Sequence, residues 1–331
     1  MVENNFIPIT GNDKKRLKFF ELYSKNFQFV KSRLNYINKD LADGLYICPI
    51  CQKAFNVDGL NPKYVDMLTL DHIPPECVGG KKMILTCKCC NNKSGNDLDK
   101  VLAAEINISP FLKGELEKSI PATFEIKTVD EHGQTISRGG RMEMFLKESN
   151  VFGFKVNMPE SDTRVEFLKS LRDRKETQIK WRVQVPNRYS ARVAELRLAY
   201  LLAFKKFGYS FSLRPQYDAI REQILNPYKE IFPNICSLNT DSRFKDDIYV
   251  VKEPEEIRSY LVVYSLVGQH GTVKRGFLIP HPFIDAVSFY QRFGEYASKK
   301  VDFRITELNQ FDFISDEKNV LRPLTLWQEI F

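Results

Sequence analysis

The two motifs Cys48-Pro-Ile-Cys51 and Cys87-Lys-Cys-Cys90 decide the fold that the sequence predicts for the N-terminal third of the chain. A Cys-x-x-Cys turn places two thiolates on one side of the backbone, and two such turns complete a tetrahedral site for a structural Zn²⁺ ion. In the second motif Cys87 can pair with Cys89 or with Cys90, and we choose Cys90 because its two-residue spacer matches the first motif. A redox role for a single Cys-x-x-Cys is the alternative, but two motifs around one short segment favour zinc. This segment has little apolar core of its own, so zinc is expected to contribute much of its folding free energy.

The overall composition is typical of a folded intracellular protein. The chain has 331 residues, which indicates two domains, and 43% of them are hydrophobic. We find neither the roughly 18 consecutive apolar residues of a membrane helix nor the pattern of a signal peptide. Six of the seven cysteines lie between residues 48 and 90, which favours metal ligands over disulfides. The sequence therefore predicts a cytoplasmic protein without a membrane partner, and its net charge of +7 favours a polyanionic partner only weakly.

Three polar residues near the cysteines are not needed by a purely structural zinc site. Asp71 and His72 are adjacent at the expected end of a short strand, and Asn91 directly follows the last zinc cysteine. Phosphodiester hydrolysis needs a base that activates water and a divalent cation that stabilises the leaving oxygen. A neutral imidazole suits the first task, and carboxylate and carboxamide oxygens suit a hard cation such as Mg²⁺. Taken alone, Asp-His is more often structural, but beside the cysteine motifs it indicates hydrolysis.

The order of expected elements predicts an α+β protein. Residues 13–38 have the periodicity of a basic amphipathic helix, residues 67–70 and 83–86 are expected strands, and a helix should follow Asn91. Beyond residue 110, alternating patterns predict further strands, and residues 190–207 predict a long helix that ends at Gly208. We therefore expect an N-terminal module over residues 1–110 and a larger α+β domain over residues 111–331.

The N-terminal module resembles the HNH endonucleases, and in particular the subgroup whose ββα-metal finger is braced by a Cys₄ zinc site. Four segments of this sequence carry the resemblance: Cys48-Pro-Ile-Cys51, Leu68-Thr-Leu-Asp71-His72-Ile-Pro-Pro, Gly79-Gly80, and Ile84-Leu-Thr-Cys87-Lys-Cys-Cys90-Asn91-Asn-Lys-Ser-Gly95. The resemblance covers about residues 46–100.

The resemblance implies a role for each candidate residue. His72 is the general base, Asp71 and Asn91 hold the catalytic divalent ion (Mg²⁺ or Mn²⁺), and Cys48, Cys51, Cys87 and Cys90 hold zinc. Asn91 stands where the last His of the family often stands, a replacement that the family itself shows. Lys82 stands where the family has its middle Asn, which orients the base loop, so this chain departs from the pattern there.

The expected function is therefore a metal-dependent endonuclease that hydrolyses DNA. Residues 194–221 resemble a region of uncharacterised bacterial HNH proteins, some of which serve in restriction or phage defence, so a partner protein in such a system is also expected. A homodimer is expected because double-strand cleavage by a single-metal module usually requires two copies. Two alternatives remain: a non-catalytic, zinc-finger-like module that binds nucleic acid or protein, and an effector nuclease that acts only with a partner or signal.

Overall fold

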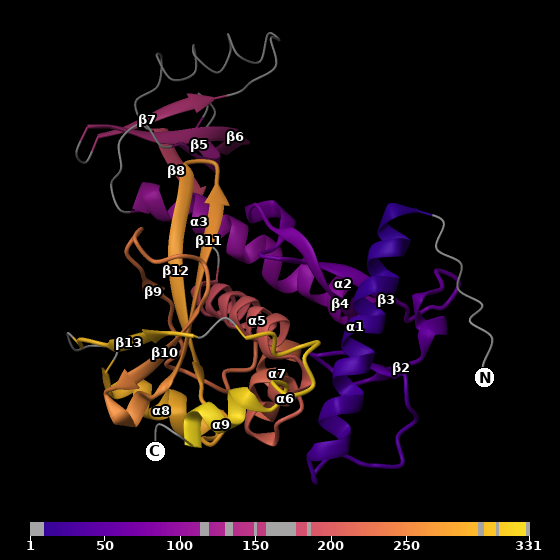
Figure 1. Ribbon diagram of the computed structural model, residues 1–331. Helices are drawn as coiled ribbons and strands as arrows, with labels where there is room; N and C mark the ends of the chain where they lie inside the picture. The colour runs from indigo at the N-terminus through magenta and orange to yellow at the C-terminus, as the bar shows by residue number, and fades with distance from the viewer. Residues whose placement is uncertain are drawn as a thin grey trace. The chain divides into compact units, whose positions relative to one another are not determined.

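The structure is a computed structural model of a mixed α+β protein, as the sequence predicts (Figure 1). It describes residues 10–112, 119–129, 135–148, 151–156, 177–183, 187–296, 301–308 and 311–328.

The chain forms two compact units. The first unit combines Met1–Ala103 with Asn187–Phe331, and the second is Ala104–Pro186. This division differs from the expected boundary near residue 110, because the helix expected at residues 190–207 packs with the N-terminal segment. The second unit is therefore an insertion between the two parts of the first.

The second cysteine motif of the first unit lies on a strand–strand–helix element, which we call the finger (β3, β4 and α2). Strands β3 (Leu68–Ile73) and β4 (Lys81–Cys87) form an antiparallel pair, followed by α2 (Lys88–Ser94). A π-helical turn, η3 (Gly95–Asp99), leads into α3 (Lys100–Leu112). Gly79 has a φ of 86°, a left-handed conformation that favours glycine in the connection between the two strands. The strands lie where the sequence predicts them, whereas the helix begins at Lys88 and includes Asn91, after which the sequence predicts its start.

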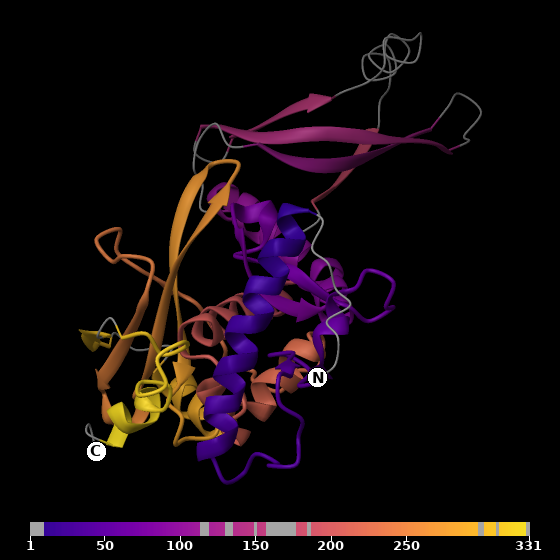
Figure 2. The ribbon, with the colours of Figure 1, turned by 45° about the vertical axis from the view of Figure 1, so that its right-hand side comes forward.

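The N-terminal basic helix, α1 (Gly11–Arg33), lies alongside the finger (Figure 2). Thr10 and Asp13 form a capping box at its start, and this satisfies backbone donors that the first turn leaves free. One face of the helix is buried, including Phe20 and Phe27. The opposite face exposes most of the lysines, so α1 has the amphipathic character that its sequence predicts.

The C-terminal part of the first unit is built around α5 (Arg188–Phe207) and a five-stranded antiparallel sheet. The sheet has the strand order β13-β10-β11-β12-β9. Most residues of α5 are buried, and they lie on all sides of the helix. Short helices complete this part. The bounds are β9 (Leu238–Asn239), β10 (Ile248–Glu253), β11 (Ser259–Gly268), β12 (Gly271–Pro280), β13 (Arg304–Glu307), α6 (Tyr209–Ser212), α7 (Asp218–Leu225), α8 (Ala286–Tyr296) and α9 (Arg322–Gln328). Among the described residues, we find no helix with the length and apolar character needed to span a membrane.

The second unit contains a four-stranded antiparallel sheet of the order β7-β6-β5-β8. Its strands are β5 (Ser119–Val129), β6 (Thr135–Glu148), β7 (Val151–Val156) and β8 (Thr177–Val183). Buried and exposed side chains alternate over residues 120–124 of β5 and 141–144 of β6, with Ile120, Phe124, Met142 and Met144 on the buried face. This alternation is typical of a sheet with one covered face.

Candidate functional site: a four-cysteine cluster beside an Asp-His-Asn group

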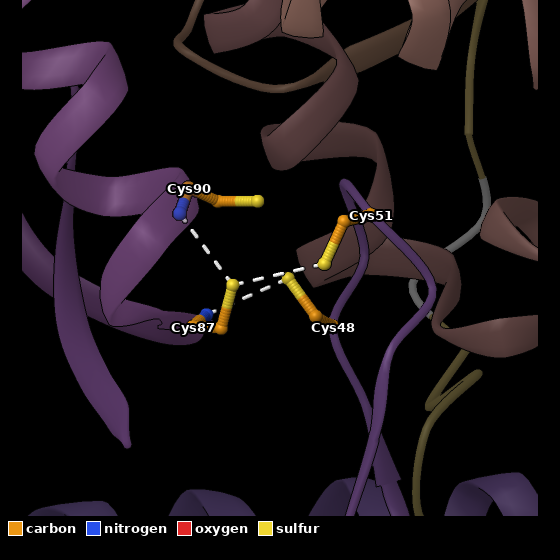
Figure 3. Close-up of side chains that lie close together, drawn as sticks. All are labelled: Cys48, Cys51, Cys87 and Cys90. Atoms are coloured by element: carbon orange, nitrogen blue, oxygen red, sulfur yellow. Dashed lines mark hydrogen bonds between the residues drawn. The ribbon is translucent and has the colours of Figure 1, made fainter. Parts of the chain in front are cut away.

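Cys48, Cys51, Cys87 and Cys90 converge in one cluster (Figure 3). Their sulfur atoms all lie within 4.8 Å of one another, and this cluster could hold a metal ion such as zinc. The backbone N–H groups of Cys87 and Cys90 lie 3.5 Å from the sulfurs of Cys48 and Cys87, respectively. The structure thus confirms Cys90 over Cys89, whose side chain is exposed.

The first cysteine motif is shaped by a tight hairpin. Strand β1 (Tyr46–Ile47) pairs with β2 (Ala54–Phe55), and Gln52 adopts a left-handed φ of 58° in the turn between them. The backbone N–H of Gln52 donates to the carbonyl of Cys48 at 2.9 Å. This turn brings Cys48 and Cys51 to the same side of the backbone, as the two-residue spacer predicts.

The four thiols influence one another strongly. Contacts with Cys48 and the other two sulfurs lower the pKa of Cys51. Contacts with Cys48 and Cys51 raise the pKa of Cys87 and of Cys90. Ionisation of one thiol therefore opposes ionisation of its neighbours, because four thiolates would concentrate negative charge in a largely buried space. A divalent cation at the centre would compensate this charge, so the donor set fits zinc.

Asp71 lies almost fully buried on β3, with a relative exposure of 2%. Its Oδ2 atom accepts two hydrogen bonds, one from the hydroxyl of Thr86 at 2.9 Å and one from Nη2 of Arg197 at 2.5 Å. Thr86 comes from the neighbouring strand β4, whereas Arg197 comes from α5, 126 residues along the chain. A carboxylate in such a place requires this compensation because burial of an unpaired charge is costly.

His72 follows directly, and an irregularity in the strand register separates it from Asp71. The two neighbours consequently differ in environment, because the side chain of His72 has a relative exposure of 24%. Its Nε2 lies 3.6 Å from Oε2 of Glu76. Across the strand pair, His72 faces Lys82. An imidazole at this position is accessible to water, as a general base must be.

Asn91, at the start of α2, is held against β3. Its side-chain Nδ2 donates to the hydroxyl of Thr69 at 2.9 Å and to the carbonyl of Leu70 at 3.3 Å. Leu70 immediately precedes Asp71, so the carboxamide lies beside the part of β3 that carries the candidate metal ligand and the candidate base. Its oxygen and the carboxylate of Asp71 are hard donors of the kind that Mg²⁺ and Mn²⁺ prefer.

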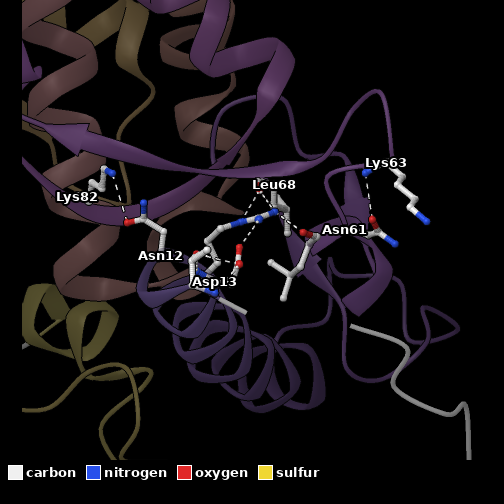
Figure 4. A network of polar contacts seen from close by, with 9 residues as sticks. Asn12, Asp13, Asn61, Lys63, Leu68 and Lys82 are labelled. Carbon is white, nitrogen blue, oxygen red and sulfur yellow. Dashed lines mark hydrogen bonds and ion pairs between the residues drawn. The ribbon is translucent and has the colours of Figure 1, made fainter. Parts of the chain in front are cut away.

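Helix α1 anchors the other end of the same strand (Figure 4). The guanidinium of Arg16 is buried and donates to the carbonyl of Leu68 at 2.7 Å and to that of Leu60. Nearby, Nζ of Lys82 lies 3.3 Å from Oδ1 of Asn12, which places the start of α1 next to the residue opposite His72. The first turn of the basic helix is thereby brought close to the candidate site.

Two residues of this site, Arg197 and Asp99, are missing from the sequence prediction. Nη1 of Arg197 lies 3.6 Å from Oδ1 of Asp99, which ends the π-helical turn after α2. Burial by itself lowers the pKa of the Arg197 guanidinium, but the carboxylates of Asp71 and Asp99 outweigh it and raise this pKa. Burial also raises the pKa of Asp99, against the opposing effect of Arg197. The sequence offers one signal for Arg197, a charged residue between Leu196 and Leu198 at the start of a long apolar run, and none for Asp99.

Comparisons of the chain with protein-family models, with curated proteins and with solved structures found no match.

Proposed function

We propose that this chain is a metal-dependent DNA endonuclease of the HNH type. One observation carries the proposal: the finger contributes two cysteines to a four-cysteine cluster and also carries an accessible imidazole next to a buried carboxylate, and its helix places a carboxamide against the same strand. Asp71 and Asn91 would hold Mg²⁺ or Mn²⁺, and the four cysteines would hold zinc.

In the proposed reaction, His72 accepts a proton from water, and the resulting hydroxide attacks the phosphorus atom. The side chain of His72 is exposed enough for this water to reach Nε2 or Nδ1. The divalent ion, when bound, supplies the positive charge that stabilises the departing 3′ oxygen. Thr86 and Thr69 contribute through hydrogen bonds that orient Asp71 and Asn91, respectively.

The distribution of lysines supports a polyanionic substrate. Lys14, Lys15 and Lys18 are exposed on the first turns of α1, next to the strand that carries exposed Lys81 and half-buried Lys82. The contact between Lys82 and Asn12 joins these two groups beside His72. Lysines in this arrangement would neutralise the phosphates on either side of a scissile bond. We therefore propose that Lys82 replaces the middle Asn of the HNH pattern with a phosphate contact.

The proposal includes a cytoplasmic location, because a reducing compartment keeps the thiols free for zinc. A homodimer, a partner protein and a role in restriction or phage defence remain predictions from the sequence.

Digestion of supercoiled DNA in the presence of Mg²⁺ or Mn²⁺ tests the proposal. We expect His72→Ala to lower the cleavage rate about 10²–10⁴-fold, the usual contribution of a general base, while zinc content and folding stay unchanged. His270→Ala provides a matched control, because His270 lies in the same compact unit at the tight connection between β11 and β12. Cleavage that continues undiminished in pure His72→Ala protein would refute the assignment.

Two other outcomes identify the alternatives. An inert wild-type protein that contains zinc and binds DNA would indicate a non-catalytic binding module. An inert purified protein whose His72→Ala variant nevertheless loses a cellular phenotype would indicate an effector nuclease that a partner or signal activates.

A further inference from the structure

Helix α5 carries two buried charges that point in opposite directions. Glu195 and Arg197 are two residues apart, which corresponds to about 200° around a helix. Glu195 is fully buried and accepts a hydrogen bond from the hydroxyl of Tyr264, on β11 of the C-terminal sheet, at 2.9 Å. Arg197, on the other side, binds Asp71 of the finger. The helix therefore connects the C-terminal sheet to the candidate metal ligand through the side chains of Glu195 and Arg197.

We propose that Arg197 is a positioning residue for the metal-binding carboxylate: it holds Oδ2 of Asp71 so that Oδ1 is presented to the divalent cation. This inference rests on the proposed function, because it concerns the same metal site.

The hydrogen bonds to Asp71 carry the proposal. Both donors, Thr86 and Arg197, bind the same oxygen atom, Oδ2. A carboxylate with one oxygen held by two donors from different elements cannot rotate freely, and its second oxygen has a fixed direction. Such outer partners orient metal ligands in many proteins, and their loss typically weakens metal binding 10–100-fold.

The local charges are compatible with a bound dication. Arg197 lies between two carboxylates, those of Asp71 and Asp99, at 2.5 Å and 3.6 Å. The three groups together carry a net charge of −1 when all are ionised. The guanidinium therefore offsets the cost of burying the carboxylates but leaves a negative charge that attracts a cation. Asp71 contacts Nη2 of Arg197 and Asp99 contacts Nη1, which leaves the guanidinium little freedom to move.

The opposite possibility is that Arg197 takes the place of the metal. In that case the guanidinium would compete with the cation for Asp71, and removal of its charge would tighten metal binding. The two possibilities predict changes of opposite sign, so one titration distinguishes them.

The experiment is a Mn²⁺ titration of the zinc-loaded full chain, followed by the electron paramagnetic resonance signal of free Mn²⁺. We expect Arg197→Met to weaken Mn²⁺ binding about 10–100-fold, and Arg197→Lys to restore part of the affinity. Thr86→Val, which removes the other donor to Oδ2 with little change of shape, should also weaken binding. Arg192→Met is the matched control, because Arg192 lies on the same helix but contacts Glu195 and Ser237.

Circular dichroism and zinc content verify that each variant is folded. If Arg197→Met does not fold, Arg197→Lys and Thr86→Val carry the test, and unchanged Mn²⁺ affinity in both would overturn the inference. Unchanged or tighter binding by folded Arg197→Met would overturn it as well.

Asp71→Asn separates this inference from the proposed function. If Asp71→Asn abolishes Mn²⁺ binding but Arg197→Met has no effect, only the role of Arg197 fails. If Asp71→Asn leaves Mn²⁺ binding unchanged, or wild-type protein binds no Mn²⁺, the metal site fails and the inference fails with it.

Discussion

The cysteine cluster and the Asp71 group both include residues of the finger, but they depend on the rest of the chain to different degrees. All four cysteines come from residues 48–90, and the two turns that carry them follow from local backbone geometry. Asp71, by contrast, obtains one of its two hydrogen bonds from Arg197, far along the chain. A short segment can thus define a candidate metal cluster, whereas the buried carboxylate of Asp71 requires support from a second part of the fold.

The largest effect is expected from loss of a cluster cysteine. Cys90→Ser should remove the bound zinc and unfold the finger, because structural zinc contributes about 10–16 kcal/mol in isolated zinc-finger peptides. The neighbouring Cys89→Ser is the matched control, since Cys89 is exposed and lies outside the cluster. Metal analysis by mass spectrometry and thermal unfolding measure both effects, with about one zinc per chain expected in the control. A Cys90→Ser variant with full zinc content would show that the cluster is not the zinc site.

A smaller effect is expected where the cluster depends on distant packing. The hydroxyl of Tyr209 accepts a hydrogen bond from the backbone N–H of Ile47 at 2.8 Å and donates to its carbonyl at 2.7 Å. Tyr209→Phe leaves both buried backbone groups unpaired, so we expect the free energy of unfolding to fall by about 2–4 kcal/mol.

Urea denaturation measures this change, and zinc content should stay at the wild-type level. Tyr36→Phe serves as the control, because the side chain of Tyr36 is 43% exposed. Loss of zinc from a folded Tyr209→Phe protein would mean that the cysteine cluster depends on the C-terminal part as strongly as Asp71 does.

The smallest effect is expected at Glu76. Its carboxylate lies 3.6 Å from Nε2 of His72, but its side chain is 80% exposed. Exposed ion pairs contribute about 0–1 kcal/mol, so Glu76→Gln should change the cleavage rate by less than about fivefold. Single-turnover cleavage rates compare it with Glu21→Gln, which makes the same charge change on exposed α1. A loss as large as that of His72→Ala would instead identify Glu76 as an essential partner of the imidazole.

The local elements of the finger could be predicted because their signals are local. The two-residue spacers predict the cysteine turns, and the short apolar runs before Asp71 and Cys87 predict the paired strands that the structure shows. The choice of Cys90 over Cys89 also follows from spacing. Cys90 lies three residues after Cys87, in the first turn of α2, and its backbone N–H lies 3.5 Å from the sulfur of Cys87.

The division of the chain could not be predicted in the same way. A boundary near residue 110 reflects the change from the finger to alternating strands, and this change is real, because β5 begins at Ser119. The sequence contains no local sign that the chain returns to the first unit at Asn187. Such a return is decided by which apolar surfaces cover each other, and this depends on contacts between distant residues.

By itself, the sequence determined the α+β class, the four cysteines of the cluster, and the adjacency of Asp71 and His72 with Asn91 nearby on the next helix. Only the tertiary structure decided that Asp71 is buried, that one of its oxygens is held by Arg197 and Thr86, and that His72 keeps access to solvent. The physical reason is the range of the interactions. Turn geometry and periodicity act over a few residues, whereas burial of a charge requires a counter-charge that the folded chain can bring from any distance in the sequence.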